Sequence, residues 1–574
     1  MLPDAIVKLP VESIEEERIS GKNHKKEWHR NMKKGFTVLL TLMFTTGIFA
    51  GCGNQAPSAE GNQPSPTASV AAETSDVIEK ISDKGINWTI FKAGHTVFGT
   101  QIDDWNDVLF FQEMEKRTGV HLEFITPVLG QEGTQFQLLV SSHQLPDFIS
   151  GTNGYTGGGE AMINDGLILD LSQYMDKLPN FNANLNATEL RSKEVYTDSG
   201  KIAGLPAFYD NDEESEIFVG ILLRKDLLEK VKLDVPVTYD DWYNVLSAFK
   251  NQAGIKKGFV PGPEMFGQNN MWSIGYGFGY VDYFGTNLPF YQIDGKVRYA
   301  PVDDTQALKS YLEMMKKWYA EGLIDPDFQS VTDVNAQIGT FSNPDTGACI
   351  TAYSLAPVLK SIAGATNPDF EYITVPIPVL EEGQKTHMYA ATSKMDLNQI
   401  LISAECKEVD LALKYWDQYY TAEGSQLACW GVENDTFTYD ANGEPQWTDK
   451  IVKNPDYNFL SMRYVNVANG LPGVYERRAQ LVEEQSIADD ALYRSHGDNS
   501  YRISSNVSLT EEENEVYAAY MSDILTFVQE KCLRYILGAE SLDTFDDMVE
   551  QVKSMNIDKV IEVYQNALDR YNAR

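Results

Sequence analysis

The strongest constraint on the fold is an alternation of short apolar runs with amphipathic stretches after residue 85. Ile86–Phe91 and Val120–Ile125 read as strands, and residues 104–117 between them carry an apolar face with helical spacing. A strand, a helix and a strand in this order predict a parallel unit. A helix over 136–142 and a short buried strand over 147–150 repeat the pattern, so we expect an α/β fold.

A glycine-rich loop over 151–159 follows the second of these units. Open α/β sheets bind ligands at the carboxyl ends of their strands, so this loop is a candidate binding element. It lacks the Lys-Ser/Thr ending of a P-loop and the GxGxxG spacing, which argues against a phosphate cradle.

Several polar residues mark helix ends and carry no predicted chemistry. Thr238 followed by Asp241 predicts a helix start, and Thr510–Glu513 is a capping box that opens a helix to about Leu537. Gly322 and Pro326 predict the end of a helix that begins near Thr305.

An export signal precedes this body. Lys33 and Lys34 are followed by an uncharged, mainly apolar segment over 35–50, which is short for a membrane span of about 20 residues. Residues 1–31 are charged and lack apolar periodicity, so we expect translation to start at Met32 and residues 1–31 to be a non-native leader.

The segment 32–51 ends in Phe49-Ala50-Gly51-Cys52, which resembles the lipobox of bacterial lipoproteins, with Phe49 where Leu is usual. This resemblance implies a diacylglyceryl group on Cys52 and an anchor at the outer face of the cytoplasmic membrane. The alternative is an ordinary secretory signal with a chance cysteine. Residues 52–85 are rich in Pro, Ser, Ala and Gly and predict a flexible tether.

Composition limits the ligands and the chemistry. The formal net charge of −36 disfavours nucleic acid and anionic lipid surfaces and favours a neutral ligand. The cysteines after Cys52 have no metal-like spacing, so we predict no metal or cofactor; they could form disulfides or stay as buried thiols. These four are Cys349, Cys406, Cys429 and Cys532.

Aromatic residues, 11% of the chain, give the positive signal for binding. Sugars present apolar CH faces and hydroxyl rims, so a sugar site needs flat rings and planar polar groups. Several aromatic residues lie among Gly, Asn and Asp in predicted loops, most densely over 272–283. The candidate ligand contacts are Trp105, Asn153, Tyr155, Phe208, Tyr209, Trp272, Tyr276, Tyr280, Tyr283, Tyr353 and Trp430.

Many short motifs in a fixed order resemble the extracellular solute-binding lipoproteins of carbohydrate ABC importers, in particular the large oligosaccharide-type subgroup of Gram-positive bacteria. The resemblance covers nearly all of 86–574. The motifs include LPDFI at 145–149, SGKIAGLPAFY at 199–209, VPVTYDDWYNVLSAFK at 235–250 and YLEMMKKWYAEGLIDPDF at 311–328.

This resemblance implies a two-lobed periplasmic-binding-protein-like fold of type II, with interleaved lobes, a hinge and a central cleft. It divides the chain into one lobe over 86–200 with 335–395 and another over 200–335 with 395–574. It also implies a monomer that carries an oligosaccharide, or another small polar solute, to ABC permease subunits. The acidic calcium loop of many relatives is replaced by NQAGIKKGFVPG at 251–262, which does not support calcium binding.

Two other functions remain open from the residues alone. A glycan hydrolase would need a carboxylate pair that sequence cannot select among so many acidic residues, and no HExxH or GxSxG motif occurs. A surface sensor or adhesion module would bind a small solute without a permease. We predict a binding protein and not an enzyme.

Overall fold

The computed structural model describes residues 75–97, 100–102, 104–128, 130–210, 219–261, 264–265, 268–269, 274–279, 289–331, 334–352, 355–387, 395–455, 457, 459–468, 470–476, 479, 484–504 and 506–574. In these ranges the chain forms two larger sheets, each with its own buried core. We call residues 75–210 and 395–479 the first body. Residues 219–387 and 484–574 are the second body.

The first body contains a six-stranded sheet in the order β18-β6-β15-β5-β1-β4. All strands run parallel except β15, which lies antiparallel between β5 and β6. The strands are β1 (Ile86–Phe91), β4 (Val120–Ile125), β5 (Phe148–Ile149), β6 (Leu205–Tyr209), β15 (Asp396–Ile402) and β18 (Gly473–Tyr475).

The predicted parallel unit is confirmed. β1 and β4 pair in register from Ile86 opposite Val120 to Phe91 opposite Ile125. The predicted helix over 104–117 is divided: Asp104 caps the short helix η1 (Trp105–Asp107), and α2 (Leu109–Thr118) follows. This division matters because it fixes Trp105 directly beside the end of β1.

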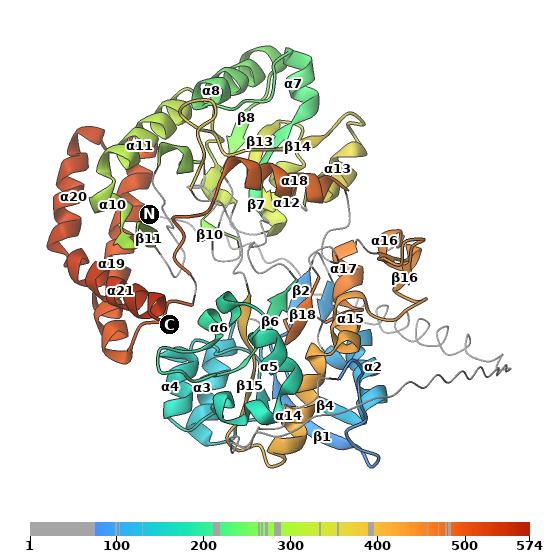
Figure 1. Cartoon of the computed structure of the whole chain (residues 1–574). Helices are drawn as coiled ribbons and strands as arrows, with labels where there is room; N and C mark the ends of the chain where they lie inside the picture. Colours follow the sequence, from blue (N-terminus) through green and yellow to red (C-terminus); the bar gives the residue numbers. More distant parts are fainter. Residues whose placement is uncertain are drawn as a thin grey trace, which may run out of the picture. The chain divides into compact units, whose positions relative to one another are not determined.

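The second body contains a four-stranded sheet in the order β14-β7-β13-β8. Both predicted helix starts are confirmed, and both form capping boxes, with Thr238 before α8 (Tyr239–Ala248) and Thr510 before α19 (Glu511–Ile536). The helices α10 (Ala300–Asp303) and α11 (Thr305–Ala320) lie beside α19, α20 (Phe545–Ser554) and α21 (Ile557–Asn572) (Figure 1). The strands are β7 (Val219–Arg224), β8 (Lys257–Val260), β13 (Thr346–Ala352) and β14 (Tyr372–Val375).

Shorter elements complete both bodies. The remaining helices are α3 (Glu132–Ser142), α4 (Gly158–Asn164), α5 (Pro179–Leu185), α6 (Glu189–Val195), α7 (Lys225–Val231), α12 (Val334–Phe341), α13 (Ala356–Gly364), α14 (Val409–Asp417), α15 (Ala422–Trp430), α16 (Asp449–Val452), α17 (Phe459–Tyr464) and α18 (Glu484–His496). The hairpins are β2 (His95–Val97) with β3 (Thr100–Ile102), β9 (Glu264–Met265) with β10 (Gln268–Asn269), β11 (Tyr291–Ile293) with β12 (Lys296–Arg298), and β16 (Phe437–Tyr439) with β17 (Pro445–Trp447).

The sheet pairings differ from the predicted division into 86–200 with 335–395 and 200–335 with 395–574. β13 and β14 both pair with β7, so 335–387 belongs to the second body. β15 pairs with β5 and β6, and β18 pairs with β6, so 395–476 belongs to the first body. The predicted assignment of these two segments is therefore wrong, because their partners are strands far away in sequence.

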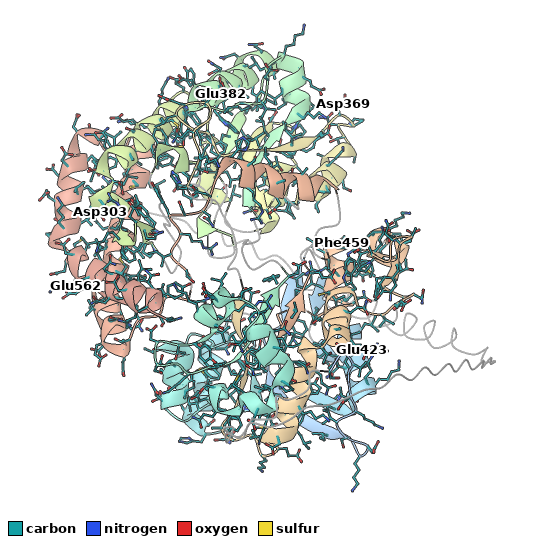
Figure 2. All side chains as sticks on the ribbon, in the orientation of Figure 1. Asp303, Asp369, Glu382, Glu423, Phe459 and Glu562 are labelled. Atoms are coloured by element: carbon teal, nitrogen blue, oxygen red, sulfur yellow. The ribbon has the colours of Figure 1, made fainter. Side chains whose placement is uncertain are left out.

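The predicted tether over 52–85 extends too far, because residues 75–85 belong to the first body. Glu423 on α15 accepts the backbone N–H of Ile78 at 2.7 Å, and Asn180 accepts that of Ser75 at 2.9 Å; Glu423 is labelled in Figure 2. Ile78 and Ile81 pack against the first core. These two apolar residues hold 75–85 on the first body, and the rest of the predicted tether lies outside the described residues.

The four cysteines after Cys52 are buried free thiols, so the alternative of disulfides is wrong. They are Cys349, Cys406, Cys429 and Cys532. Burial raises the pKa of the Cys406 thiol to about 11, which leaves it protonated near neutral pH. Within the described part of the chain, no helix is long and apolar enough to span a bilayer.

Candidate functional site

The carboxyl edge of the first sheet brings together residues from distant parts of the chain. β1, β5, β6 and β18 all end at this edge, and the antiparallel β15 begins there. Such an edge is where open α/β sheets bind ligands. The residues with polar or aromatic groups at this edge are Lys92, Trp105, Tyr209, Asp396 and Tyr475.

Lys92 and Trp105 form a pair just beyond β1. The Trp105 Nε1–H donates to the Ala93 carbonyl at 3.1 Å, which fixes the indole, and the Lys92 Nζ lies 4.6 Å from the ring centroid. The Lys92 ammonium also donates to the Gly470 carbonyl at 3.0 Å. Only 6% of Lys92 and 2% of Trp105 is exposed.

The Lys92 ammonium is buried without a counter-ion. In the described part of the chain, no carboxylate lies within ion-pair distance of its Nζ. Desolvation lowers the pKa of Lys92 to about 8. One backbone carbonyl accepts from an ammonium that has three donors, so Lys92 retains hydrogen-bonding capacity at the edge where a ligand is expected.

A second group lies at the ends of β6 and β18. The Tyr209 hydroxyl donates to the Asp396 carboxylate at 3.0 Å, and its ring centroid lies 6.3 Å from that of Tyr475. The Tyr475 hydroxyl donates to the Leu471 carbonyl at 3.1 Å. Arg191 on α6 donates to the Tyr209 carbonyl at 2.8 Å. This group combines aromatic rings with a carboxylate acceptor, as recognition of hydroxyl groups requires.

The glycine-rich loop places the other predicted polar contacts after β5. The Asn153 amide donates to the Ser150 and Gly151 carbonyls at 3.1 and 2.9 Å, and so holds the loop in shape. The Tyr155 hydroxyl donates to Asp165 at 2.6 Å, a bond that raises the pKa of Tyr155 to about 12. Both residues keep their predicted place at the edge, and their role as ligand contacts stays a prediction.

Three predicted contacts lie inside hydrophobic cores. Phe208 is 0% exposed, and its ring packs between Phe181 and Tyr420. Trp430 is 3% exposed, with its ring 4.8 Å from that of Trp447 in the β16–β17 hairpin; Phe459 on α17 packs on the same hairpin (Figure 2).

Tyr276 is 4% exposed in the second core, in a turn that packs against Val379. We leave Phe208, Trp430 and Tyr276 out of the candidate site, because their rings pack within the cores and do not follow a strand end. Trp105 is equally buried, at 2% exposed, and we keep it for its position beside the end of β1.

The chain is similar in sequence to two binding proteins of known name. No family model matches the chain. It is 23% identical over 505 residues to the fructooligosaccharide ABC transporter substrate-binding protein FusA of Streptococcus pneumoniae. The matched region covers 82% of this chain and 88% of FusA. It is 22% identical over 488 residues to the polygalacturonan/rhamnogalacturonan-binding protein YtcQ of Bacillus subtilis, covering 81% and 90%.

Solved structures agree over the same length. An HMO-binding, ABC-transporter-associated solute-binding protein of Bifidobacterium longum infantis superposes with a TM-score of 0.69 at 18% identity, over 85% of this chain and 99% of that one. The alginate-binding protein AlgQ2 gives 0.67 at 21%, over 85% and 99%. This chain has the two-lobed fold of the ABC-transporter solute-binding proteins. The predicted resemblance and fold class are confirmed.

Four predicted ligand contacts and the predicted lipid-attachment residue lie outside the described residues. These are Cys52, Trp272, Tyr280, Tyr283 and Tyr353.

Sequence reasoning missed three residues of this edge: Lys92, Asp396 and Tyr475. Lys92 directly follows the predicted strand Ile86–Phe91, so the rule that ligands bind beyond strand ends could have selected it. Asp396 begins the antiparallel β15 and Tyr475 ends β18, and no local pattern announces that either strand joins this sheet.

The side chains at this edge offer aromatic rings, an ammonium and a carboxylate to a ligand. Among the described residues, no group of three or more His, Cys, Asp or Glu side chains is arranged to hold a metal ion. At the predicted calcium-free loop over 251–262, the Lys257 ammonium pairs with Asp325 at 2.7 Å. The Asp325 carboxylate, next to this loop, is thus paired with the Lys257 ammonium. The relatives are named as binding proteins and not as enzymes.

Proposed function

We propose that this protein is an extracellular, lipid-anchored receptor that captures an oligosaccharide between its lobes and delivers it to the permease of an ABC transporter. The carboxyl edge of the first sheet carries the proposal. There, Trp105, Tyr209 and Tyr475 lie with the Lys92 ammonium and with the Asp396 carboxylate that accepts from Tyr209, which suits a ligand with apolar faces and many hydroxyls.

Closure of the lobes on the ligand would supply the signal for delivery. The chain passes between the bodies three times: after β6, after β14 and after β18. A ligand that contacts both bodies favours the closed arrangement by its differential affinity. Cys52 carries the lipid in this proposal, and a relative in Bacillus subtilis, 26% identical over 223 residues, is named as the lipoprotein LipO.

The charge at the edge favours a neutral glycan. Four carboxylates lie at or next to the strand ends, against the Lys92 ammonium and the Arg191 guanidinium, and the chain as a whole carries −36. A uronic acid chain would meet repulsion from these groups. The carboxylates are Asp104, Asp210, Asp396 and Glu476.

Thermal unfolding against a glycan panel tests the proposal. A ligand that binds only the native state raises the unfolding midpoint by mass action. We expect kestose or another neutral trisaccharide to raise the midpoint, and trigalacturonate at the same concentration to leave it unchanged. The Asp396→Ala variant should lose most of the shift, because it removes the carboxylate that orients Tyr209. A midpoint raised only by trigalacturonate would contradict the choice of a neutral ligand, and no shift across the panel would contradict sugar binding.

A further inference from the structure

A patch of hydrogen bonds and ion pairs connects the two bodies away from the strand ends. On the first body it consists of α6 and the turn after it, and on the second body of α21, Ser504 and residues 506–508. We call Glu194, Asp198, Arg570, Tyr571 and Arg574 the clasp.

Glu194 is the buried centre of the clasp. It is 5% exposed, and its carboxylate accepts from the Tyr571 hydroxyl at 2.5 Å, from the Ser504 hydroxyl at 2.9 Å and from the Asn506 amide. Burial, and then the charge of Glu194, raise the pKa of the Tyr571 hydroxyl. A buried carboxylate that depends on three donors of the other body is costly to expose without them.

Asp198 holds the second part of the clasp. Its carboxylate accepts from Arg570 Nε at 2.9 Å and from Arg574 Nε at 2.8 Å, and its side chain is 19% exposed. Arg570 also makes two bonds to Glu513 on α19, at 2.7 and 2.6 Å. Glu513 on the second body therefore orients the guanidinium that bonds to Asp198 on the first.

The helix α6 connects the clasp to the candidate site. Arg191 donates to the Tyr209 carbonyl at 2.8 Å, and its guanidinium lies 4.6 Å from the Phe208 ring centroid. One turn later, Glu194 is bonded to the second body. The same short helix thus holds the end of β6 at the ligand edge and the contact between the bodies.

We propose that the clasp is a fixed pivot that sets ligand affinity from outside the binding site. This inference rests on the proposed function, because it concerns closure on a ligand. With the pivot intact, the bodies move about one contact, and a large fraction of molecules is ready to close. Without it the bodies adopt more arrangements, so the competent fraction and the apparent affinity both fall.

Two measurements test the pivot, and the first needs no ligand. Spin labels are placed at Ser141→Cys on α3 and Glu229→Cys on α7, both exposed, in a Cys52→Ser background. We expect the distance distribution between them to broaden in the Glu194→Ala/Asp198→Ala variant and, to a smaller degree, in Arg574→Ala. Glu189→Ala removes an exposed carboxylate from the same helix and should change nothing.

The second measurement is the affinity for kestose, which should fall by about tenfold in the double variant. A distribution as narrow as that of the unchanged chain would overturn the pivot, whichever glycan binds. A broadened distribution with unchanged affinity would overturn the link to the site. If the unchanged chain does not bind kestose, the proposed ligand is wrong, and the spin-label distances still decide the pivot.

Discussion

The Lys92→Met variant is expected to be more stable than the unchanged protein at pH 7, and to bind its glycan more weakly. Lowering the pKa of Lys92 from 10.5 to about 8 corresponds to a penalty of about 3 kcal/mol for the buried charge. The variant also loses the bond to Gly470 and the contact with Trp105, so we expect a net gain of about 2 kcal/mol.

The gain should disappear at high pH. Below pH 8 the native and unfolded states both carry the Lys92 proton, and the whole penalty is present. Between pH 8 and 10.5 the native state loses the proton first, so the unfolded state binds more protons and stability rises with pH. Above pH 10.5 both states are neutral and the penalty is gone.

Urea unfolding at pH 7 and pH 10 measures both effects, and titration with kestose measures binding. The Lys116→Met variant is the control. The Lys116 ammonium is exposed and forms a surface ion pair, so this substitution should change the unfolding free energy little. A Lys92→Met variant that is less stable at pH 7 would show that the ammonium stabilises the fold. Unchanged binding would remove Lys92 from the site.

The Phe208→Ala variant is expected to lose about 3 to 5 kcal/mol of unfolding free energy, as truncation of a buried phenylalanine does. The ring is fully buried between Phe181 and Tyr420, with the Arg191 guanidinium over its face. Any loss of binding should follow the loss of folded protein, measured by denaturant unfolding and by the active fraction in a titration.

Tyr209→Phe is the matched variant at the next residue. It keeps the ring but removes the hydroxyl that donates to Asp396, so it should change stability by about 1 kcal/mol and weaken glycan binding. If instead Phe208→Ala stays stable and loses binding, Phe208 is a ligand contact and its assignment to the core is wrong.

Local patterns predicted the local structure well. Ile86–Phe91 and Val120–Ile125 are strands with the predicted bounds, and Thr238 and Thr510 begin helices as their side chains predict. These features depend on residues within a few positions of each other. The assignment of 335–387 and 395–476 to lobes is wrong, because β13 and β14 pair with β7 and β15 inserts between β5 and β6. These pairings join strands more than 100 residues apart, which no local pattern predicts.

The candidate site was predictable in part. Trp105 and Tyr209 lie at strand ends, as the loop argument predicts. The same argument names Phe208 as well, although neighbouring strand residues face opposite sides of the sheet. Tyr276 and Trp430 sit among glycines and small residues that suggested loops, and each packs into a core instead. Residue type alone does not distinguish an aromatic ring in the core from one that a ligand can contact, because burial of the ring depends on residues far away in sequence.

The most direct test of the central claim is recovery of the glycan after binding. The protein is saturated with kestose, incubated for a day, separated from free sugar and denatured, and the released sugar is analysed by chromatography. A solute receptor should return intact kestose, one molecule per chain. Monosaccharide and disaccharide products in place of kestose would show that the protein is a hydrolase and contradict the account.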